Sequence, residues 1–274
     1  MDTTPTLSII TINLNNHDGL KRTIDSVVCQ TFTDYEWIVI DGGSTDGSRE
    51  LIEQYQNHFA YWVSEPDKGI YNAMNKGIAH AHGEWLQFLN SGDCLYQNTT
   101  LEKVFSRDYE ADIIYGNGAY CENRTIFTLP SQLSLSCLLK HNISHQASFY
   151  KRSLYDNKLF DEQFLVVADY ALILEFAISG KKFEYINQIL VLIEGGGISS
   201  TNIGDAETLI MKKKVIPIIV QKDIDKLNTI EEQLFFINSH KTLKLINNLN
   251  LHIISLLGKA IRIIEGQRKK SHNS

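Results

Sequence analysis

The feature that most constrains the fold is a regular alternation, over the first ninety residues, of short apolar runs with stretches of helical period. Residues 7–12 and 37–40 are β-branched and apolar, as in strands buried on both faces. Between them, apolar side chains at i, i+4, i+7 and i+8 predict a helix, with Asp18 as its N-cap. Residues 61–63 and 85–89 predict two more strands. This alternation indicates right-handed βαβ units and a mainly parallel, Rossmann-like sheet flanked by helices.

Further elements follow from the same patterns. A helix is predicted to open at Ser44 or Thr45, and another covers 70–81. The later half is less regular. A strand is predicted at 112–116, a helix at 169–179, and a strand and turn at 183–193. Beyond Asp205 few glycines and many Leu, Ile, Lys and Asn predict two or three helices. The domains expected are therefore a catalytic domain over 1–204 and a C-terminal helical region over 205–274.

Polar segments follow each of the first four predicted strands. Residues 13–16, 41–44, 64–69 and 90–93 are all rich in Asp, Asn, Ser and Gly. In an open parallel sheet, ligands bind outside the carboxyl ends of the strands. The composition and the predicted topology therefore indicate a binding site at the same edge of the sheet.

Asp41 stands at a strand end, before two glycines and a predicted helix start. Free backbone amides at such a position favour a polar or anionic ligand, and the carboxylate can accept hydrogen bonds from a nucleobase or a ribose. The alternative is that Asp41 and Ser44 only shape the turn and cap the helix. There is no G-x-G-x-x-G segment, which argues against an NAD or FAD site.

Asn90 and Asp93 form the second strand-end cluster. Their oxygen atoms suit a hard divalent cation, which could neutralise a departing diphosphate. The alternative is a plain turn. The four cysteines are scattered without a C-x-x-C pair, so the sequence predicts no zinc or redox site.

The charge of the chain is uneven. The formal net charge of −6 argues against a nucleic-acid partner. Seven Lys and Arg against the single Glu265 nevertheless give residues 241–274 a local charge of +6. In that tail His252, Ser255, Lys259 and Arg262 share one helical stripe among apolar residues. Two interpretations stay open: a helix docked on the inner face of the cytoplasmic membrane, or one packed on the catalytic domain or a homodimer partner.

Several segments together resemble a known family. Residues 6–11 with Asn15, residues 26–32, and residues 36–47 are similar to the opening of the family 2 glycosyltransferases, which have the GT-A fold. Residues 65–77 resemble the version found in bacterial enzymes of colanic-acid and other surface-polysaccharide pathways. The resemblance covers about residues 5–200. It implies a hexosyltransferase-type enzyme that inverts the anomeric centre of a nucleotide-sugar, usually a UDP-sugar, with a carbohydrate or lipid-linked saccharide as acceptor.

The resemblance also implies roles for matching positions. Asp93 is expected to bind the metal, Mn²⁺ or Mg²⁺, because residues 90–93 lie where the family has its Asp-x-Asp motif. Asn90 and Gly92 stand where acids are common, which leaves Asp93 as the only carboxylate of the motif. The residues expected to bind the donor are Thr11, Asn13, Asn15, Asp41, Asp67, Lys68 and Asn90.

The catalytic base is expected in the later half. Residues 166–172 resemble the family's Glu-Asp-Tyr-Asp-Leu segment, with Ala168 in place of the Glu and Asp169 at the position of the base. A base of this kind is expected to be semi-buried with a raised pKa; the alternative is that Asp169 caps a helix. His145 and Gln146 resemble the segment that lines the acceptor pocket. Residues 195–199 resemble a loop that closes over the donor.

Three functions from different classes compete. The leading one is an active glycosyltransferase. The second is a catalytically silent nucleotide-sugar-binding protein, suggested by the altered metal motif and the missing Glu at position 168. The third, a sugar nucleotidyltransferase, is disfavoured because no glycine-rich basic loop follows the first strand. The N-terminus has no basic region followed by an apolar core, so the expected location is the cytoplasm, with peripheral membrane association as the alternative.

Overall fold

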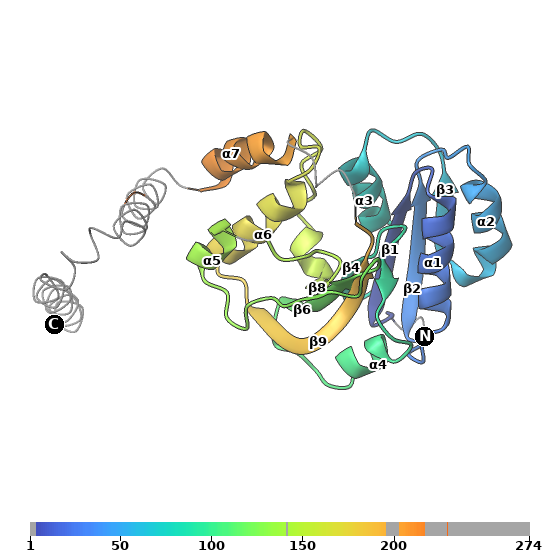
Figure 1. Cartoon of the computed structure of the whole chain (residues 1–274), viewed down its shortest axis with the longest axis horizontal. Helices are drawn as coiled ribbons and strands as arrows, with labels where there is room; N and C mark the ends of the chain where they lie inside the picture. Colours follow the sequence, from blue (N-terminus) through green and yellow to red (C-terminus); the bar gives the residue numbers. More distant parts are fainter. Residues whose placement is uncertain (1–3, 141, 196–202, 217–228, 230–274) are drawn as a thin grey trace, which may run out of the picture. The chain divides into compact units, whose positions relative to one another are not determined.

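The computed structural model describes residues 4–140, 142–195, 203–216 and 229. The chain divides by its contacts into two compact units, Met1–Val215 and Ile216–Ser274. Every labelled strand and helix lies in the first unit (Figure 1). Most of the predicted C-terminal helical region, including its basic stripe, lies outside the described residues, so the domain boundary after residue 204 stays a prediction.

One mixed sheet organises the first unit. Its strand order is β3-β2-β1-β4-β8-β6-β9-β5, and β7 pairs with β6 (Figure 1). The first four strands of this order are parallel, whereas β8 is antiparallel to both of its neighbours. The strands are β1 (Leu7–Asn13), β2 (Tyr35–Asp41), β3 (Tyr61–Ser64), β4 (Trp85–Phe88), β5 (Cys94–Leu95), β6 (Ile113–Tyr120), β7 (Ile126–Phe127), β8 (Ser148–Lys151) and β9 (Phe183–Ile193).

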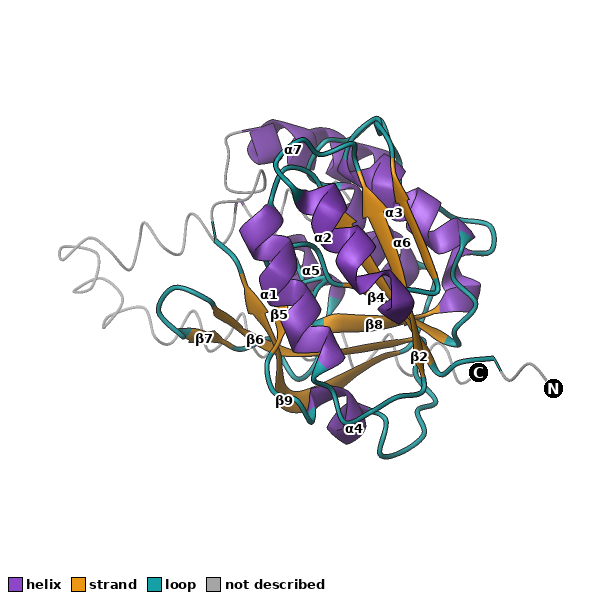
Figure 2. Ribbon diagram, turned by 90° about the vertical axis from the view of Figure 1, so that its right-hand side faces the viewer, coloured by secondary structure: helices purple, strands orange, loops and turns teal. Residues whose placement is uncertain are grey.

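Helices cover both faces of the sheet because alternate side chains of each strand point to opposite faces. Along β1, Leu7 and Ile9 belong to a core shared with α1, α2 and α4, whereas Ile10 and Ile12 belong to a core shared with α3 and α6 (Figure 2). The helices are α1 (His17–Val28), α2 (Ser48–Tyr55), α3 (Ile70–Ala79), α4 (Thr100–Val104), α5 (Leu135–Lys140), α6 (Ala168–Ile178) and α7 (Ile203–Val215), with 3₁₀ turns η1 (Gln56–His58) and η2 (Arg152–Tyr155).

The predicted α/β architecture is confirmed, but two helix starts are wrong. Helix α1 is capped by Asn16, whose Oδ1 accepts from the backbone N–H of Gly19 at 3.1 Å, and not by Asp18. Helix α2 begins at Ser48 because Gly47, at φ 94°, has a left-handed backbone that no helix continues through. Asp46 accepts from the N–H of Ser48 at 3.1 Å and so satisfies the first turn.

The sequence analysis did not predict strand β8. Its register pairs Trp85 with Lys151 and Leu86 with Tyr150, in antiparallel sense. The residues that precede β8 therefore run toward the carboxyl end of β4. This places His145 and Gln146 beside the polar segment that follows β4.

Across the described part of the chain, no helix has both the length and the apolar composition needed to cross a bilayer.

Candidate active site

The turn after β2 is organised around the carboxylate of Asp41, which is fully buried. Oδ1 accepts from Asn13 Nδ2 at 2.7 Å and from the Ser44 hydroxyl at 2.6 Å. Oδ2 accepts from the Ser44 backbone N–H at 2.9 Å and from the Ser64 hydroxyl at 2.6 Å. Burial pushes the pKa of Asp41 up, but these hydrogen bonds outweigh it and hold the pKa below its ordinary value. A carboxylate has about four acceptor sites, so the protein's own donors fill this one.

The turns after β1 and β2 are joined by Asn15. Its backbone is left-handed, at φ 49°, which Asn tolerates better than most residues. Its N–H donates to the Ser44 hydroxyl at 2.7 Å, and its Oδ1 accepts from the N–H of Thr45 at 2.9 Å. Asn15 therefore holds the ends of β1 and β2 together as one polar surface, which is called the strand-end floor below.

Asp67 covers this floor. A Cβ at Gly42 would lie 2.5 Å from the Asp67 carboxylate, so the absence of a side chain at position 42 is what permits the approach. The carboxylate also accepts from the N–H of Gly69 at 2.8 Å. Lys68 is exposed beside it. The strand-end segments thus bring Asp67 to the Asp41 turn, as the expected donor site requires.

Asp169 lies at the centre of a second network, built from α3, α6 and the segment before β8. Tyr71 donates its hydroxyl to Oδ1 at 2.9 Å, and His145 Nδ1 lies 2.8 Å from Oδ2. Asn90 Nδ2 lies 3.3 Å from His145 Nε2. If His145 is neutral and protonated on Nδ1, each of these contacts has one donor and one acceptor. The network therefore connects Asp169 to the end of β4.

Two expectations for Asp169 are wrong. It does not cap α6, because the N-cap is Val167 and the Asp169 carboxylate faces His145 and Tyr71. Its pKa is also not raised. Burial pushes it up, but the hydrogen bonds from His145 and Tyr71 outweigh burial, so the pKa lies below its ordinary value.

Asp93 is buried beside β9. Its Oδ1 accepts from the backbone N–H of Glu194 at 2.9 Å. Burial raises the pKa of Asp93 to about 6, because it outweighs the Glu194 hydrogen bond and the nearby His145. Near neutral pH this carboxylate therefore has an energetic reason to gain a cationic partner.

The other predicted residues have local roles. Thr11 is fully buried, and its hydroxyl accepts from the Trp37 indole N–H at 3.0 Å, which places it beneath the site. Gln146 accepts through its backbone carbonyl from Gln87 at 3.1 Å and through its side chain from Ser144 at 2.7 Å. Of the predicted loop at 195–199, residues 196–199 lie outside the described residues.

Three side chains of these networks were missed from the sequence. Tyr71 lay inside the segment that carried the resemblance, but nothing in one sequence pairs it with Asp169. Arg22 and Glu194 form an ion pair, and Glu194 also accepts from Asn16 Nδ2 at 3.0 Å. Glu194 directly precedes the three glycines, and its charge there was the available signal.

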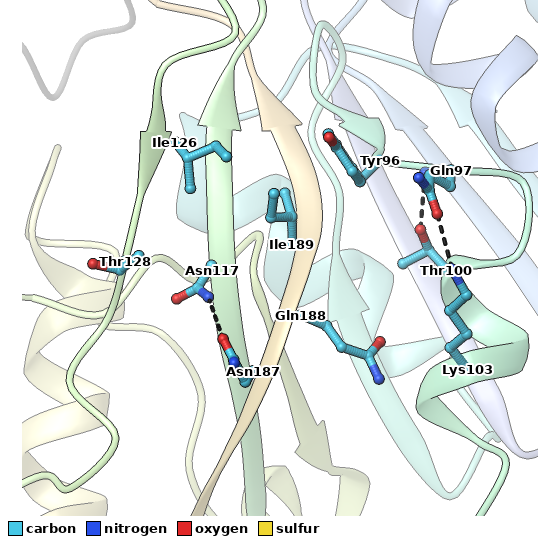
Figure 3. Close-up of a pocket in the computed structure, with 10 residues that line it drawn as sticks. All are labelled: Tyr96, Gln97, Thr100, Lys103, Asn117, Ile126, Thr128, Asn187, Gln188 and Ile189. Atoms are coloured by element: carbon cyan, nitrogen blue, oxygen red, sulfur yellow. Dashed lines mark hydrogen bonds between the residues drawn. The ribbon is translucent and has the colours of Figure 1, made fainter.

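A cavity of about 440 Å³ lies elsewhere, between α4 and strands β6 and β9. Figure 3 shows that amide and hydroxyl side chains such as Asn117, Asn187, Gln188 and Thr100 line it. It contains none of the predicted site residues. The strand-end cluster is therefore separate from this cavity.

Within the described ranges, no group of three or more His, Cys, Asp or Glu side chains is arranged to hold a metal ion without further ligands. Asn90 Oδ1 is buried without a hydrogen-bond partner, however, and Asp93 lies three residues on. Nucleotide-bound Mg²⁺ is typically held by one or two carboxylates together with substrate phosphates. The residues present fit a cation bound in that way.

A parallel sheet half with polar strand ends, joined to a mixed half that supplies a buried carboxylate, defines the class of GT-A glycosyltransferases. The family model described as "Glycosyl transferase family 2" matches residues 8–179. The chain belongs to this family and is a glycosyltransferase.

Sequence relatives agree with this assignment. An uncharacterized glycosyltransferase of Mycobacterium tuberculosis is 38% identical over 193 residues, covering 65% of this chain and 71% of the relative. A PGL/p-HBAD biosynthesis glycosyltransferase of Mycobacterium bovis is 37% identical over 158 residues, covering 55% of this chain. This chain spans 61% of that relative's length.

Solved structures show the same fold at low identity. S. aureus TarS 1–349 in complex with UDP-GlcNAc has a TM-score of 0.64 at 17% identity, over 76% of this chain and 65% of that chain. Mannosyltransferase PcManGT from Pyrobaculum calidifontis, in complex with GDP-Man and Mn²⁺, has a TM-score of 0.57 at 16% identity, over 78% of this chain and 63% of that one. At these identities the likeness shows the fold alone.

Proposed function

We propose that this glycosyltransferase inverts the anomeric centre of a nucleotide-sugar, with Asp169 as general base. The observation that carries the proposal is the Asp169 network: an almost buried carboxylate held between His145 and Tyr71, at hydrogen-bond distances of 2.8 and 2.9 Å. Its lowered pKa keeps it ionised at neutral pH, which is the form that accepts a proton. A single base of this kind is sufficient for a direct displacement.

In the proposed step the acceptor oxygen attacks the anomeric carbon from the side opposite the nucleoside diphosphate. The bond to the diphosphate breaks with its electron pair, and the hydroxyl proton passes to Asp169. Because the pKa of Asp169 is low, this transfer becomes favourable only as the attacking oxygen bonds to carbon and turns acidic. His145 and Tyr71 fix the orientation of the carboxylate during the transfer.

The donor is proposed to lie over the strand-end floor. Asn13, Asn15, Asp41 and Asp67 shape that floor, and the exposed side chain of Lys68, next to Asp67, is proposed to contact the diphosphate. Since its four acceptor sites are filled, Asp41 acts mainly by organising the turn; a base contact would require the hydroxyl of Ser44 or Ser64 to turn away. UDP is the expected nucleotide, and the solved neighbours with UDP-GlcNAc and GDP-Man support a nucleotide-sugar donor.

Asn90 and Asp93 would hold the cation, Mn²⁺ or Mg²⁺. When bound, it would neutralise charge that develops on the leaving diphosphate. The neighbour solved with GDP-Man and Mn²⁺ supports this role. The acceptor is proposed to be a carbohydrate or a lipid-linked saccharide that approaches from the His145 and Gln146 side.

The test has two stages. A thermal-shift panel of UDP, GDP, dTDP and CMP, each with Mn²⁺, Mg²⁺ or EDTA, identifies the donor class, because a ligand at about 100 times its Kd stabilises by roughly 2.7 kcal/mol. Release of the nucleoside diphosphate from the matching sugars is then compared between wild type and Asp169→Asn. We expect the variant to bind nucleotide normally and to turn over about 10²-fold more slowly or worse.

Glu175→Gln is the matched control, because Glu175 lies on the same helix and pairs with Lys158 instead of the network. Normal turnover in Asp169→Asn would remove Asp169 as the base. Nucleotide binding without turnover in the wild type would favour the second candidate, a silent nucleotide-sugar-binding protein, for which the Asn and Gly at positions 90 and 92 are the supporting observation.

A further inference from the structure

Gly92 lies against the side chain of Glu194, which would have to move if position 92 carried a side chain. Its backbone is left-handed, at φ 100°, and a Cβ placed there would lie 1.9 Å from Glu194 Oε2 and 2.8 Å from Glu194 Cδ. Two heavy atoms cannot approach so closely. The Glu194 carboxylate therefore occupies the volume that an acidic side chain at position 92 would enter.

Glu194 arrives at this position through the sheet. Strand β5 pairs with β9 so that Cys94 lies opposite Leu192. Continued by two residues, this antiparallel register sets Glu194 opposite Gly92 and next to Asp93, and the N–H of Glu194 donates to Asp93 Oδ1 at 2.9 Å. The two acidic residues are thus joined by a direct hydrogen bond although they are 101 positions apart.

Two side chains contact the Glu194 carboxylate, which is still partly exposed to solvent. Oε2 accepts from Asn16 Nδ2 at 3.0 Å, Oε1 pairs with Arg22, and the side chain is 39% exposed. Arg22 is itself 46% exposed. The ion pair can therefore open toward solvent, and a divalent cation would compete with Arg22 for the carboxylate.

We infer that Glu194 supplies to the donor's cation the carboxylate that position 92 lacks, acting with Asp93 and Asn90. The inference rests on the proposed function. Three observations carry it: the Glu194 carboxylate fills the position-92 volume, its backbone is bonded to Asp93, and Asn90 Oδ1 is buried without a partner. Together they provide two carboxylates and an amide oxygen, which is the hard-oxygen chemistry that Mn²⁺ and Mg²⁺ prefer.

The experiment measures Mn²⁺ binding by the full chain, through the electron paramagnetic resonance signal of free Mn²⁺, with and without UDP. Glu194→Gln keeps the shape of the side chain and removes its charge. We expect Mn²⁺ affinity in the presence of UDP to fall about tenfold or more, since even outer-shell changes at metal sites cost about 10–100-fold. Arg22→Met removes the competing cation and is expected to raise Mn²⁺ affinity.

Glu122→Gln is the matched control. Glu122 is exposed, and its Oε1 lies 3.6 Å from where a Cβ on Gly195 would be, so the variant removes an equal charge nearby. We expect it to bind Mn²⁺ as the wild type does. The double variant Gly92→Asp with Glu194→Ala returns a carboxylate to the same volume; Asp is enriched among non-glycine residues at positive φ, and the strain that remains at φ 100° is measured by its urea midpoint. We expect it to recover most of the affinity lost in Glu194→Ala.

A purely structural Arg22–Glu194 pair predicts a different pattern. Glu194→Gln and Arg22→Met would then lower the urea midpoint together and leave Mn²⁺ affinity at its wild-type value, and that result would overturn the inference alone. A wild-type chain that binds no Mn²⁺ with UDP present would overturn both the inference and the proposed metal site. UDP binding in EDTA, measured in parallel, keeps the donor proposal separate from either outcome.

Discussion

Asp41→Asn tests whether Asp41 organises the turn after β2 or serves as a direct ligand contact. The replacement keeps the shape of the side chain and exchanges one acceptor oxygen for an N–H donor. If the new NH2 group takes the position of Oδ2, it faces the Ser44 backbone N–H. A backbone N–H can only donate a hydrogen bond, so two donors then face each other. If the NH2 group faces Oδ1's partners, it opposes Asn13 Nδ2 and the Ser44 hydroxyl. Asn13 can turn its amide because its own oxygen has no partner, and the hydroxyl can rotate to accept. The second orientation is therefore the less costly one.

The magnitude follows from the bonds that remain. In the second orientation the two hydrogen bonds to Oδ2, from the Ser44 N–H and the Ser64 hydroxyl, become bonds to a neutral acceptor, and each such exchange costs about 1 kcal/mol. The lowered pKa of Asp41 shows that its donors more than offset the cost of burying the charge. We therefore expect a loss of about 2 kcal/mol in the free energy of unfolding, or roughly 4–8 °C in Tm for a unit of this size.

The assay is urea denaturation at pH 7.5, with nucleotide binding measured on the same samples. Because the folded pKa lies below the ordinary 3.8, the contribution of Asp41 is present above that pH and is lost as pH falls through the folded value. The difference between wild type and variant should therefore shrink in acid. Ser64→Ala, which removes one of the four donors, should cost only about 1 kcal/mol. A variant Asp41→Asn that unfolds at the wild-type urea concentration but no longer binds nucleotide would refute the reasoning.

Two further predictions concern the neighbouring networks. Tyr71→Phe removes a hydrogen bond that lowers the pKa of Asp169. The acidic limb of the pH–rate profile for nucleoside diphosphate release should therefore move to higher pH, with a smaller loss of turnover than in Asp169→Asn. An acidic limb at the wild-type pH would mean that Tyr71 does not act on the base. Asp93→Asn should stabilise the fold in EDTA. The folded pKa of about 6 exceeds the ordinary 3.8, so wild-type stability falls as pH rises between about 4 and 6, by about 3 kcal/mol at 1.4 kcal/mol per pKa unit. Urea midpoints at pH 4 and pH 8 measure this, and equal midpoints at pH 8 would contradict it.

Much of the parallel half could be predicted from the sequence alone. Residues 37–40 are apolar throughout, and residues 7–12 are apolar except for Ser8 and Thr11, which are also buried. Strands covered by helices on both faces have no solvent-facing side, so their sequences are mostly apolar. The polar segments after those strands converge because parallel strands end at one edge of the sheet. Asp41, Asn15 and Asp67 accordingly meet as expected. Local pattern was sufficient here because each βαβ unit fixes the position of the next.

The helix starts show where local pattern fails. Asp18 and Asn16 are both good caps by residue type, and only the hydrogen bond that the Gly19 N–H donates to Asn16 Oδ1 decides between them. Ser44 is a residue type that often caps helices, but its hydroxyl donates a hydrogen bond to Asp41 instead. In both cases neighbouring residues compete for the same role, and propensity does not rank them.

Tertiary structure alone decided the second half of the site. Tyr71 reaches Asp169 across 98 residues, and Glu194 reaches Asp93 across 101. The first contact depends on α3 and α6 packing in the same core on one face of the sheet, and the second on the register of β5 against β9. The sequence determined which residue types could carry the chemistry and which strand ends would present them. The strand order and register decided which side chains these residues contact. The free energy that selects a strand pairing comes from burying whole faces of the sheet, and not from the few side chains that the pairing brings together.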